Sequence, residues 1–262
     1  MKDGPPQHAV AQTLGQVKGV VVRQKVQTAE VVAQAFGVPL EAKNRYKVHT
    51  LPPNKVVKNA PNDPDGWEPT SEELEALEPF LFAKEESDCL TRTCLTWLGC
   101  GNLRPLRMHF TVLEESGDVY VIDRPFKLGG CCGCPLEMNL DLVVDREHPV
   151  RLGRVREDFS PYFGRCAASC CLATTYTDID RALPDGTYET KYSLRTNVSC
   201  CGRVNNCCGA TCFKHDAVYD ILDTKGEIYV LEFPRDSTPE DRILLIAALF
   251  QVEYKIFEQQ SE

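Results

Sequence analysis

Short apolar stretches separated by turn-forming residues run along most of this chain. Residues 45–50 and 138–144 alternate apolar and polar positions, which is the period of a β-strand buried on one face. Turn signals lie between such stretches, for example residues 115–118 (ESGD) and 184–186 (PDG). Short strands at this spacing predict an all-β sandwich or barrel. The expected strands are residues 19–22, 45–50, 79–84, 107–113, 119–124, 138–144, 150–155, 213–222 and 227–233, with two more flanking residues 184–186.

The carboxyl-terminal segment breaks this pattern, because residues 243–250 read ILLIAALF. Thr238 can cap a helix there, Pro239 suits its first position, and Asp241 can complete a capping box. A helix that is apolar on every side must be surrounded by protein or by lipid, and this run is far shorter than the roughly 20 residues that span a bilayer. We therefore expect a β-barrel threaded by this helix. Its core side chains would be Ile243, Leu244, Leu245, Ile246, Leu249 and Phe250.

Three other segments stand apart from the strand pattern. Residues 1–16 are polar without periodicity and predict a disordered arm, so the folded domain would be residues 17–258. Residues 27–36 have helical spacing and end before a Gly-Val-Pro sequence. Residues 51–69 are rich in proline and turn residues, and the SEELEAL stretch that follows predicts one or two helical turns capped by Thr70 or Ser71. We treat residues 51–79 as a loop insertion in the domain, and the sequence assigns it no function.

The charge balance limits the classes of partner. The chain has 262 residues, a formal net charge of −9 and 43% hydrophobic residues, which suits a globular fold with a real core. An acidic chain is a poor nucleic-acid binder, since phosphate contacts need basic patches. It is also a poor candidate for purely electrostatic docking on an anionic membrane. If the protein works at a membrane, acyl chains or apolar surface must hold it there.

Fourteen cysteines are the most unusual feature of the composition, and many stand close together, as in the run Cys131-Cys132-Gly133-Cys134. No secretory signal opens the chain, so we expect reduced thiols and not disulfides. Zinc is unlikely from spacing alone, although His215 follows Cys212 by three residues. Two interpretations of the cysteines remain open. Thiols beside a membrane-facing surface can carry fatty acids, and buried thiols can pack as small hydrophobic groups.

Enzymatic chemistry is not expected. The chain has no GxSxG, no HExxH and no glycine-rich phosphate loop. Its single histidines have no nucleophile beside them in the sequence, and adjacent carboxylates such as Glu114 and Glu115 would point to opposite faces of a strand. We therefore interpret these residues as surface or structural groups.

Several further stretches are specific when they are taken together and in order. They are residues 21–30 (VVRQKVQTAE) with 43–48 (KNRYKV), 82–94 (FAKEESDCLTRTC), 124–126 (RPF) followed by 131–135 (CCGCP), and 233–234 (FP) with a closing 257–258 (FE). This series, which covers most of residues 18–258, resembles the phospholipid scramblase family. The resemblance implies a tubby-like fold, a closed antiparallel barrel of about twelve strands around a buried C-terminal helix.

The resemblance also implies a function. It points to bidirectional, ATP-independent movement of phospholipids between leaflets by a protein attached to the cytosolic face of a membrane, in particular the plasma membrane. Palmitoylated cysteines would provide the attachment, at Cys131, Cys132 and Cys134 of this chain. One acyl chain gives only marginal binding, so two or three are needed for stable anchoring. The implied partners are phospholipids and the membrane surface, with protein partners allowed and no nucleic acid.

The same resemblance implies activation by Ca²⁺ through an acidic segment shortly before the Phe-Pro pair. The matching positions here are Asp220 and Asp223, but Lys225 stands where an oxygen ligand is wanted, and a plain hairpin turn is the alternative. A second function is also open, namely a lipid-tethered interaction or signalling module that has the same barrel and moves no lipid.

Overall fold

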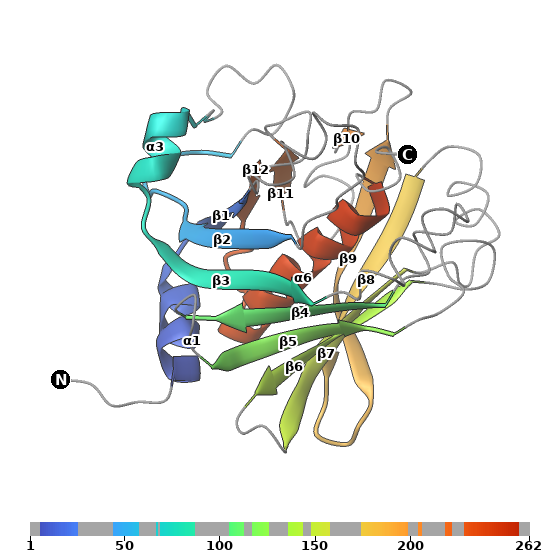
Figure 1. Cartoon of the computed structure of the whole chain (residues 1–262). Coiled ribbons are helices and arrows are strands. Elements are labelled where there is room, and N and C mark those ends of the chain that lie inside the picture. The colour runs from blue at the N-terminus through green and yellow to red at the C-terminus, as the bar shows by residue number, and fades with distance from the viewer. Residues whose placement is uncertain are drawn as a thin grey trace, which may run out of the picture.

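The computed structural model of the chain describes residues 6–25, 44–57, 67, 69–86, 105–112, 117–125, 136–143, 148–157, 174–198, 204–205, 218–221 and 228–256. In this part of the chain a strongly curved antiparallel sheet surrounds one long helix (Figure 1). The helices are α1 (Pro6–Gln16), α3 (Ser71–Ala76) and α6 (Pro239–Ile256). The strands are β1 (Gly19–Gln24), β2 (Arg45–Thr50), β3 (Pro79–Glu86), β4 (Leu106–Thr111), β5 (Asp118–Arg124), β6 (Glu137–Val143), β7 (Pro149–Glu157), β8 (Thr174–Ala182), β9 (Tyr188–Val198), β10 (Val204–Asn205), β11 (Val218–Ile221) and β12 (Ile228–Glu232).

The sheet is a meander that is extended at both ends. Strands β1 to β9 pair with their neighbours in chain order, and β12 adds antiparallel to the free side of β1. The short strands β10 and β11 then stand at the two ends of the order, beside β9 and β12. The mainly β class, the C-terminal helix and the β11–β12 hairpin agree with the sequence prediction. The closed barrel is not confirmed, because no pairing joins β10 to β11 among the described residues.

Helix α6 forms the centre of the inner core, the main hydrophobic cluster enclosed by the sheet. Every side chain from residue 243 to residue 250 is no more than 2% exposed. The helix packs against β6 to β9 and α1, and its Phe250 ring lies 4.8 Å from the ring of Tyr46 in β2 and 5.8 Å from that of Phe110 in β4. The six large side chains predicted for this core supply on the order of 10 kcal/mol of hydrophobic stabilisation.

Gly153 in β7 lets the sheet approach α6 closely. A Cβ atom at this position would lie 2.2 Å from the carbonyl oxygen of Asp180 and 3.0 Å from both methyl groups of Leu244. Real Cβ atoms do not come that near to a backbone oxygen, so only glycine fits here without a shift of β7 or β8.

Helix α1 differs from the disordered arm that the sequence predicts for residues 1–16. Val10 and Leu14 are buried, at 2% and 0% exposure, and they stand four residues apart on one face of α1. The guanidinium of Arg242 donates to the carbonyl oxygens of Leu14 and Val17, where α1 ends. A carbonyl group in the last turn of α1 thus finds its hydrogen-bond donor 228 residues away in the sequence. A local sequence pattern cannot reveal such a partner.

The insertion covers the outside of the sheet. Val21 in β1 and Val230 in β12 lie outside the inner core, and described side chains of the insertion pack on them. We call this second group the outer cluster, which consists of Val21, Leu51, Val57, Trp67, Leu74 and Val230. Strand β1 is therefore buried on both faces, which explains its run of three valines.

Candidate functional site

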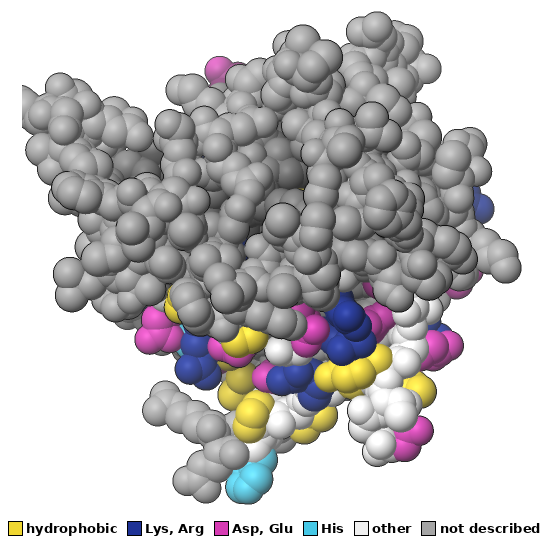
Figure 2. Space-filling view, turned by 90° about the vertical axis from the view of Figure 1, so that its right-hand side faces the viewer, with side chains coloured by type: hydrophobic (Ala, Val, Ile, Leu, Met, Phe, Trp, Pro, Cys, Tyr) yellow, Lys and Arg dark blue, Asp and Glu magenta, His cyan; other side chains and the backbone are white. Residues whose placement is uncertain are grey.

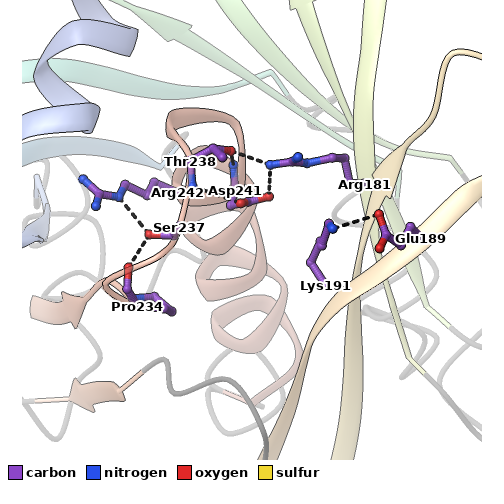
Figure 3. A network of polar contacts seen from close by, with 8 residues as sticks. All are labelled: Arg181, Glu189, Lys191, Pro234, Ser237, Thr238, Asp241 and Arg242. Carbon is purple, nitrogen blue, oxygen red and sulfur yellow. Dashed lines mark hydrogen bonds and ion pairs between the residues drawn. The ribbon is translucent and has the colours of Figure 1, made fainter.

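A polar network surrounds the beginning of α6 (Figure 3). The Thr238 amide donates to Asp241 Oδ2 at 3.0 Å, and the Asp241 amide donates to Thr238 Oγ1 at 3.3 Å, which is the capping box predicted from the sequence. Arg181 from β8 donates to Asp241 Oδ1 at 2.5 Å and also to Thr238 Oγ1. The network thus fixes the first turn of α6 to the sheet.

Arg242 continues this network into the core. Its side chain donates to Ser237 Oγ at 2.9 Å and to the carbonyl oxygen of Val17 at 2.9 Å, and its guanidinium lies 5.2 Å from the ring of Phe233. Burial lowers the pKa of Arg242. Burial, together with the nearby charge of Asp241, raises the pKa of Tyr192 to about 12. Because these charged groups contact each other and the backbone, the network is suited to hold α1, α6 and β8 together.

The opposite end of the sheet, where α6 ends, also carries buried polar groups. The amide of Leu136 donates to Glu157 Oε2 at 2.9 Å, and the amide of Glu157 donates to the Leu136 carbonyl oxygen at 2.9 Å. Gln251 of α6 reaches the same carbonyl at 3.5 Å. Glu157, Gln251 and Arg124 are each no more than 3% exposed. Sequence reasoning missed these residues, although alternation along β7 places Glu157 on the same face as Gly153 and Val155.

The structure does not place the predicted lipidation sites or the side chains of the predicted calcium site. Cys131, Cys132 and Cys134 lie outside the described residues, as does Asp223. Asp220 lies in β11 opposite Val230, but its side chain is outside the described part. Within the described ranges no group of three or more His, Cys, Asp or Glu side chains could hold a metal ion. Acylation and calcium binding therefore stay predictions.

The strand ends that border most of the cysteine-containing stretches lie on one side of the sheet. All fourteen fall outside the described residues, in the sequence intervals 87–104, 126–135, 158–173, 199–203 and 206–217. The first interval lies between β3 and β4, the second between β5 and β6, and the third between β7 and β8. Strand β9 ends just before the fourth interval. In the pairing register these ends lie together on one side of the sheet, the side where Gln251 of α6 contacts Leu136. We call this side the α6 carboxyl end.

The exposed sheet face carries charges of both signs. On the face seen in Figure 2, the described Lys and Arg side chains are interspersed with Asp and Glu and with scattered hydrophobic groups. Ion pairs cross neighbouring strands, such as Arg154 with Asp180 at 2.8 Å and Arg151 with Asp141. These charges neutralise each other locally, at a partly exposed pair for Arg151 and Asp141 and at a buried carboxylate for Arg154 and Asp180.

Comparison with curated proteins finds relatives of one kind. The chain is 23% identical over 195 residues to "Phospholipid scramblase 2" of Bos taurus, covering 68% of this chain. It is 22% identical over 256 residues to "Phospholipid scramblase 1" of Homo sapiens, covering 94% of this chain. The rat protein of the same name matches at 22% identity over 263 residues.

The chain is a distant relative of the phospholipid scramblases. It spans 57% to 64% of the length of these scramblases. No family model matches it, and no solved structure matches it. In the described residues, no helix combines the length and the apolar character needed to cross a membrane.

Proposed function

We propose that this chain is a scramblase-like protein that promotes bidirectional, ATP-independent movement of phospholipids between leaflets. The observation that carries the proposal is the match to "Phospholipid scramblase 1" of Homo sapiens over 94% of the chain. Movement of this kind needs no covalent chemistry, which agrees with the absence of catalytic motifs from the sequence. The closed form of the barrel, with β10 and β11 brought together, is part of the proposal.

In this proposal the α6 carboxyl end faces the cytosolic surface of the plasma membrane. Acyl chains on Cys131, Cys132 and Cys134 would attach the protein there, because the strands on either side of residues 126–135 end on that side. Two or three chains suffice for stable anchoring. They also outweigh the electrostatic repulsion between an acidic chain and an anionic leaflet.

The buried state of α6 limits the mechanism. A charged headgroup crosses hydrocarbon only at high cost, so a scramblase must offer a polar path or thin the bilayer locally. The apolar side chains of residues 243–250 in α6 are enclosed by protein and are not available to lipid. We therefore propose that the chain acts from the surface, by local thinning beneath its acylated end, and that Ca²⁺ bound near Asp220 and Asp223 would tune this action.

The second candidate function is a lipid-tethered interaction module without transport. It is favoured by the enclosure of residues 243–250 of α6 and by the polar network that fixes both α1 and β8 to the beginning of this helix. A barrel held together in this way on an acyl anchor can present a surface to protein partners without disturbing the bilayer.

Reconstitution distinguishes the two functions. The acylated full chain is placed in liposomes that contain a fluorescent phospholipid, and chemical quenching from outside reports how fast inner-leaflet lipid appears outside. We expect faster exchange than in empty liposomes, and loss of both exchange and membrane binding in the triple variant Cys131→Ser, Cys132→Ser, Cys134→Ser. Membrane binding without faster exchange would favour the interaction module.

Two controls complete this design. Hydroxylamine should lower the mass of the membrane-bound protein by its acyl groups and should leave the triple serine variant unchanged. The variant Asp220→Asn, Asp223→Asn should weaken any dependence of exchange on Ca²⁺, and an unchanged dependence would remove these two residues from the proposal.

A further inference from the structure

His49 lies at the boundary between the sheet and the insertion. It stands directly opposite Val21 in the β1–β2 register and opposite Pro79 in the β2–β3 register. Opposite residues of an antiparallel pair point to the same face of a sheet. Since Val21 belongs to the outer cluster, the imidazole of His49 faces the same covered surface, and it is only 3% exposed.

The surroundings of His49 disfavour a charged ring. Within ordinary hydrogen-bond geometry neither ring nitrogen has a partner. Burial is the largest influence and lowers the pKa of His49 below its usual value of 6.5. The cations Arg23 of β1 and Lys47 of β2 act in the same direction, while the backbone of Leu77 and Glu78 opposes them without reversing the result. The ring is therefore neutral while the insertion covers it.

Several of the described polar contacts within the insertion centre on Glu73. Glu73 accepts from Lys55 Nζ at 3.0 Å and from Trp67 Nε1 at 3.2 Å, and its side chain also accepts from the amide of Thr70 at 3.0 Å. These hydrogen bonds lower the pKa of Glu73 below its usual 4.5. Between neutral pH and about pH 5, His49 is thus the group beneath the described part of the insertion whose charge would change.

We propose that the described parts of the insertion, residues 51–57, 67 and 69–78, form an acid-released cover, which leaves the outer faces of β1 and β12 when His49 becomes protonated. The sign follows from proton binding. In the released form the ring is in water and binds a proton near pH 6.5, whereas in the packed form it binds a proton only at a lower pH. Cover is complete above about pH 6.5. Each pH unit below about 6.5 raises the ratio of the released to the packed form by up to about tenfold, until the ring is protonated in the packed form as well.

Trp67 reports on this release directly, because it is 8% exposed in the outer cluster. The full chain carrying Trp97→Phe has Trp67 as its only tryptophan, since the sequence contains two. From pH 7.5 to about pH 5 we expect its fluorescence to shift to longer wavelength while the far-ultraviolet circular dichroism of the sheet stays constant. An unshifted spectrum over this range would overturn the proposal.

Three variants separate titration of His49 from a general loss of packing. His49→Phe keeps a ring at the site without a titrating group, and we expect its Trp67 spectrum to be independent of pH in this range. Lys47→Gln removes one cation that resists protonation, so the release midpoint should move to lower pH. His109→Gln is the matched control, because His109 bonds Asp118 and Glu86 on β5 and β3, and it should leave the midpoint in place.

Two results would contradict the assignment to His49. One is a pH transition that persists unchanged in His49→Phe. The other is a transition that disappears in His109→Gln. If His49→Phe does not fold, the direction of the shift in Lys47→Gln decides the question, since a purely structural histidine would give no shift.

Discussion

The inner core and the outer cluster are both apolar, yet they are built in different ways. The inner core has α6 at its centre and receives side chains from strands that span nearly the whole sheet. The outer cluster has six members, and all but two come from a single segment between β2 and β3. One therefore depends on contacts far apart in the sequence, and the other on a local cover that rests on β1 and β12.

This difference predicts different cooperativity. Loss of a contact in the inner core is felt by α6 and by every strand that touches it, so the whole domain should unfold together. Loss of a contact in the outer cluster releases a segment whose hydrogen bonds are mostly its own, such as that from the Trp67 amide to the Val56 carbonyl at 2.9 Å. Local opening of this kind needs less free energy than global unfolding.

The largest effect is expected for Leu245, which is fully buried in α6. Leu245→Ala should lower the free energy of unfolding by about 2–5 kcal/mol, and Leu245→Asp should prevent folding because an unpaired charge cannot be buried there. Urea unfolding followed by circular dichroism measures the loss of stability in Leu245→Ala and shows whether Leu245→Asp folds at all. Val56→Ala, at a side chain that is 44% exposed, is the control and should be nearly neutral. A well-folded Leu245→Asp protein would contradict the enclosed position of α6.

A second test acts on the contact between β7 and α6. Gly153→Ala places a methyl group against the Asp180 carbonyl and Leu244, so we expect a loss of about 1–3 kcal/mol from overpacking. Gly117→Ala adds the same group where nothing lies within 4 Å, and it should change the stability little. Equal unfolding midpoints for the two variants would show that the close approach is not required.

In the outer cluster, Trp67→Ala should act locally. It removes a ring that packs on the cluster and whose Nε1 donates to Glu73, which weakens the cover by about 1.5–3 kcal/mol. Hydrogen exchange followed residue by residue should quicken in residues 69–77 and stay slow in α6. Equal acceleration in both regions would mean that the two clusters unfold as one unit.

The smallest effect is expected at the cap of α3. Thr70 Oγ1 accepts from the Glu73 amide at 3.2 Å, so Thr70→Ala should cost about 1 kcal/mol of local stability. Thr70→Ser keeps a hydroxyl acceptor at this position and should therefore retain the local stability. Faster exchange of the Glu73 and Leu74 amides in the alanine variant alone is the expected result, and identical rates in the two variants would exclude a role for the cap.

The sequence predicts the inner core better than the outer cluster for a physical reason. Eight apolar residues in a row, preceded by Thr238 and Asp241, contain both the helix and its burial within one short window. Hydrophobic alternation likewise gives most strands from β2 to β7 to within a few residues. These signals are local, so they can be interpreted without knowledge of the partner.

The outer cluster and α1 depend on distant partners. Trp67 and Leu74 lie in a proline-rich, acidic stretch that looks like a solvated loop, and only the register of β1 with β2 and β12 shows what it covers. Helix α1 is likewise completed by Arg242. For the candidate site, the capping residues of α6 could be predicted from the sequence, but Arg181, Arg242 and Glu157 could not. Single charged residues carry no pattern that distinguishes a buried partner from a surface charge.

The place of α6 in the chain order has a consequence for biosynthesis. This helix leaves the ribosome after all of the described strands, at a rate of about 5–20 residues per second. Until α6 has been synthesised, the concave side of the nascent sheet has no helix to pack against. Its valines, leucines and aromatic rings stay exposed to chaperones or to neighbouring chains. The native state can thus form only once translation has passed α6, and that waiting period is when the protein is most exposed to misassembly.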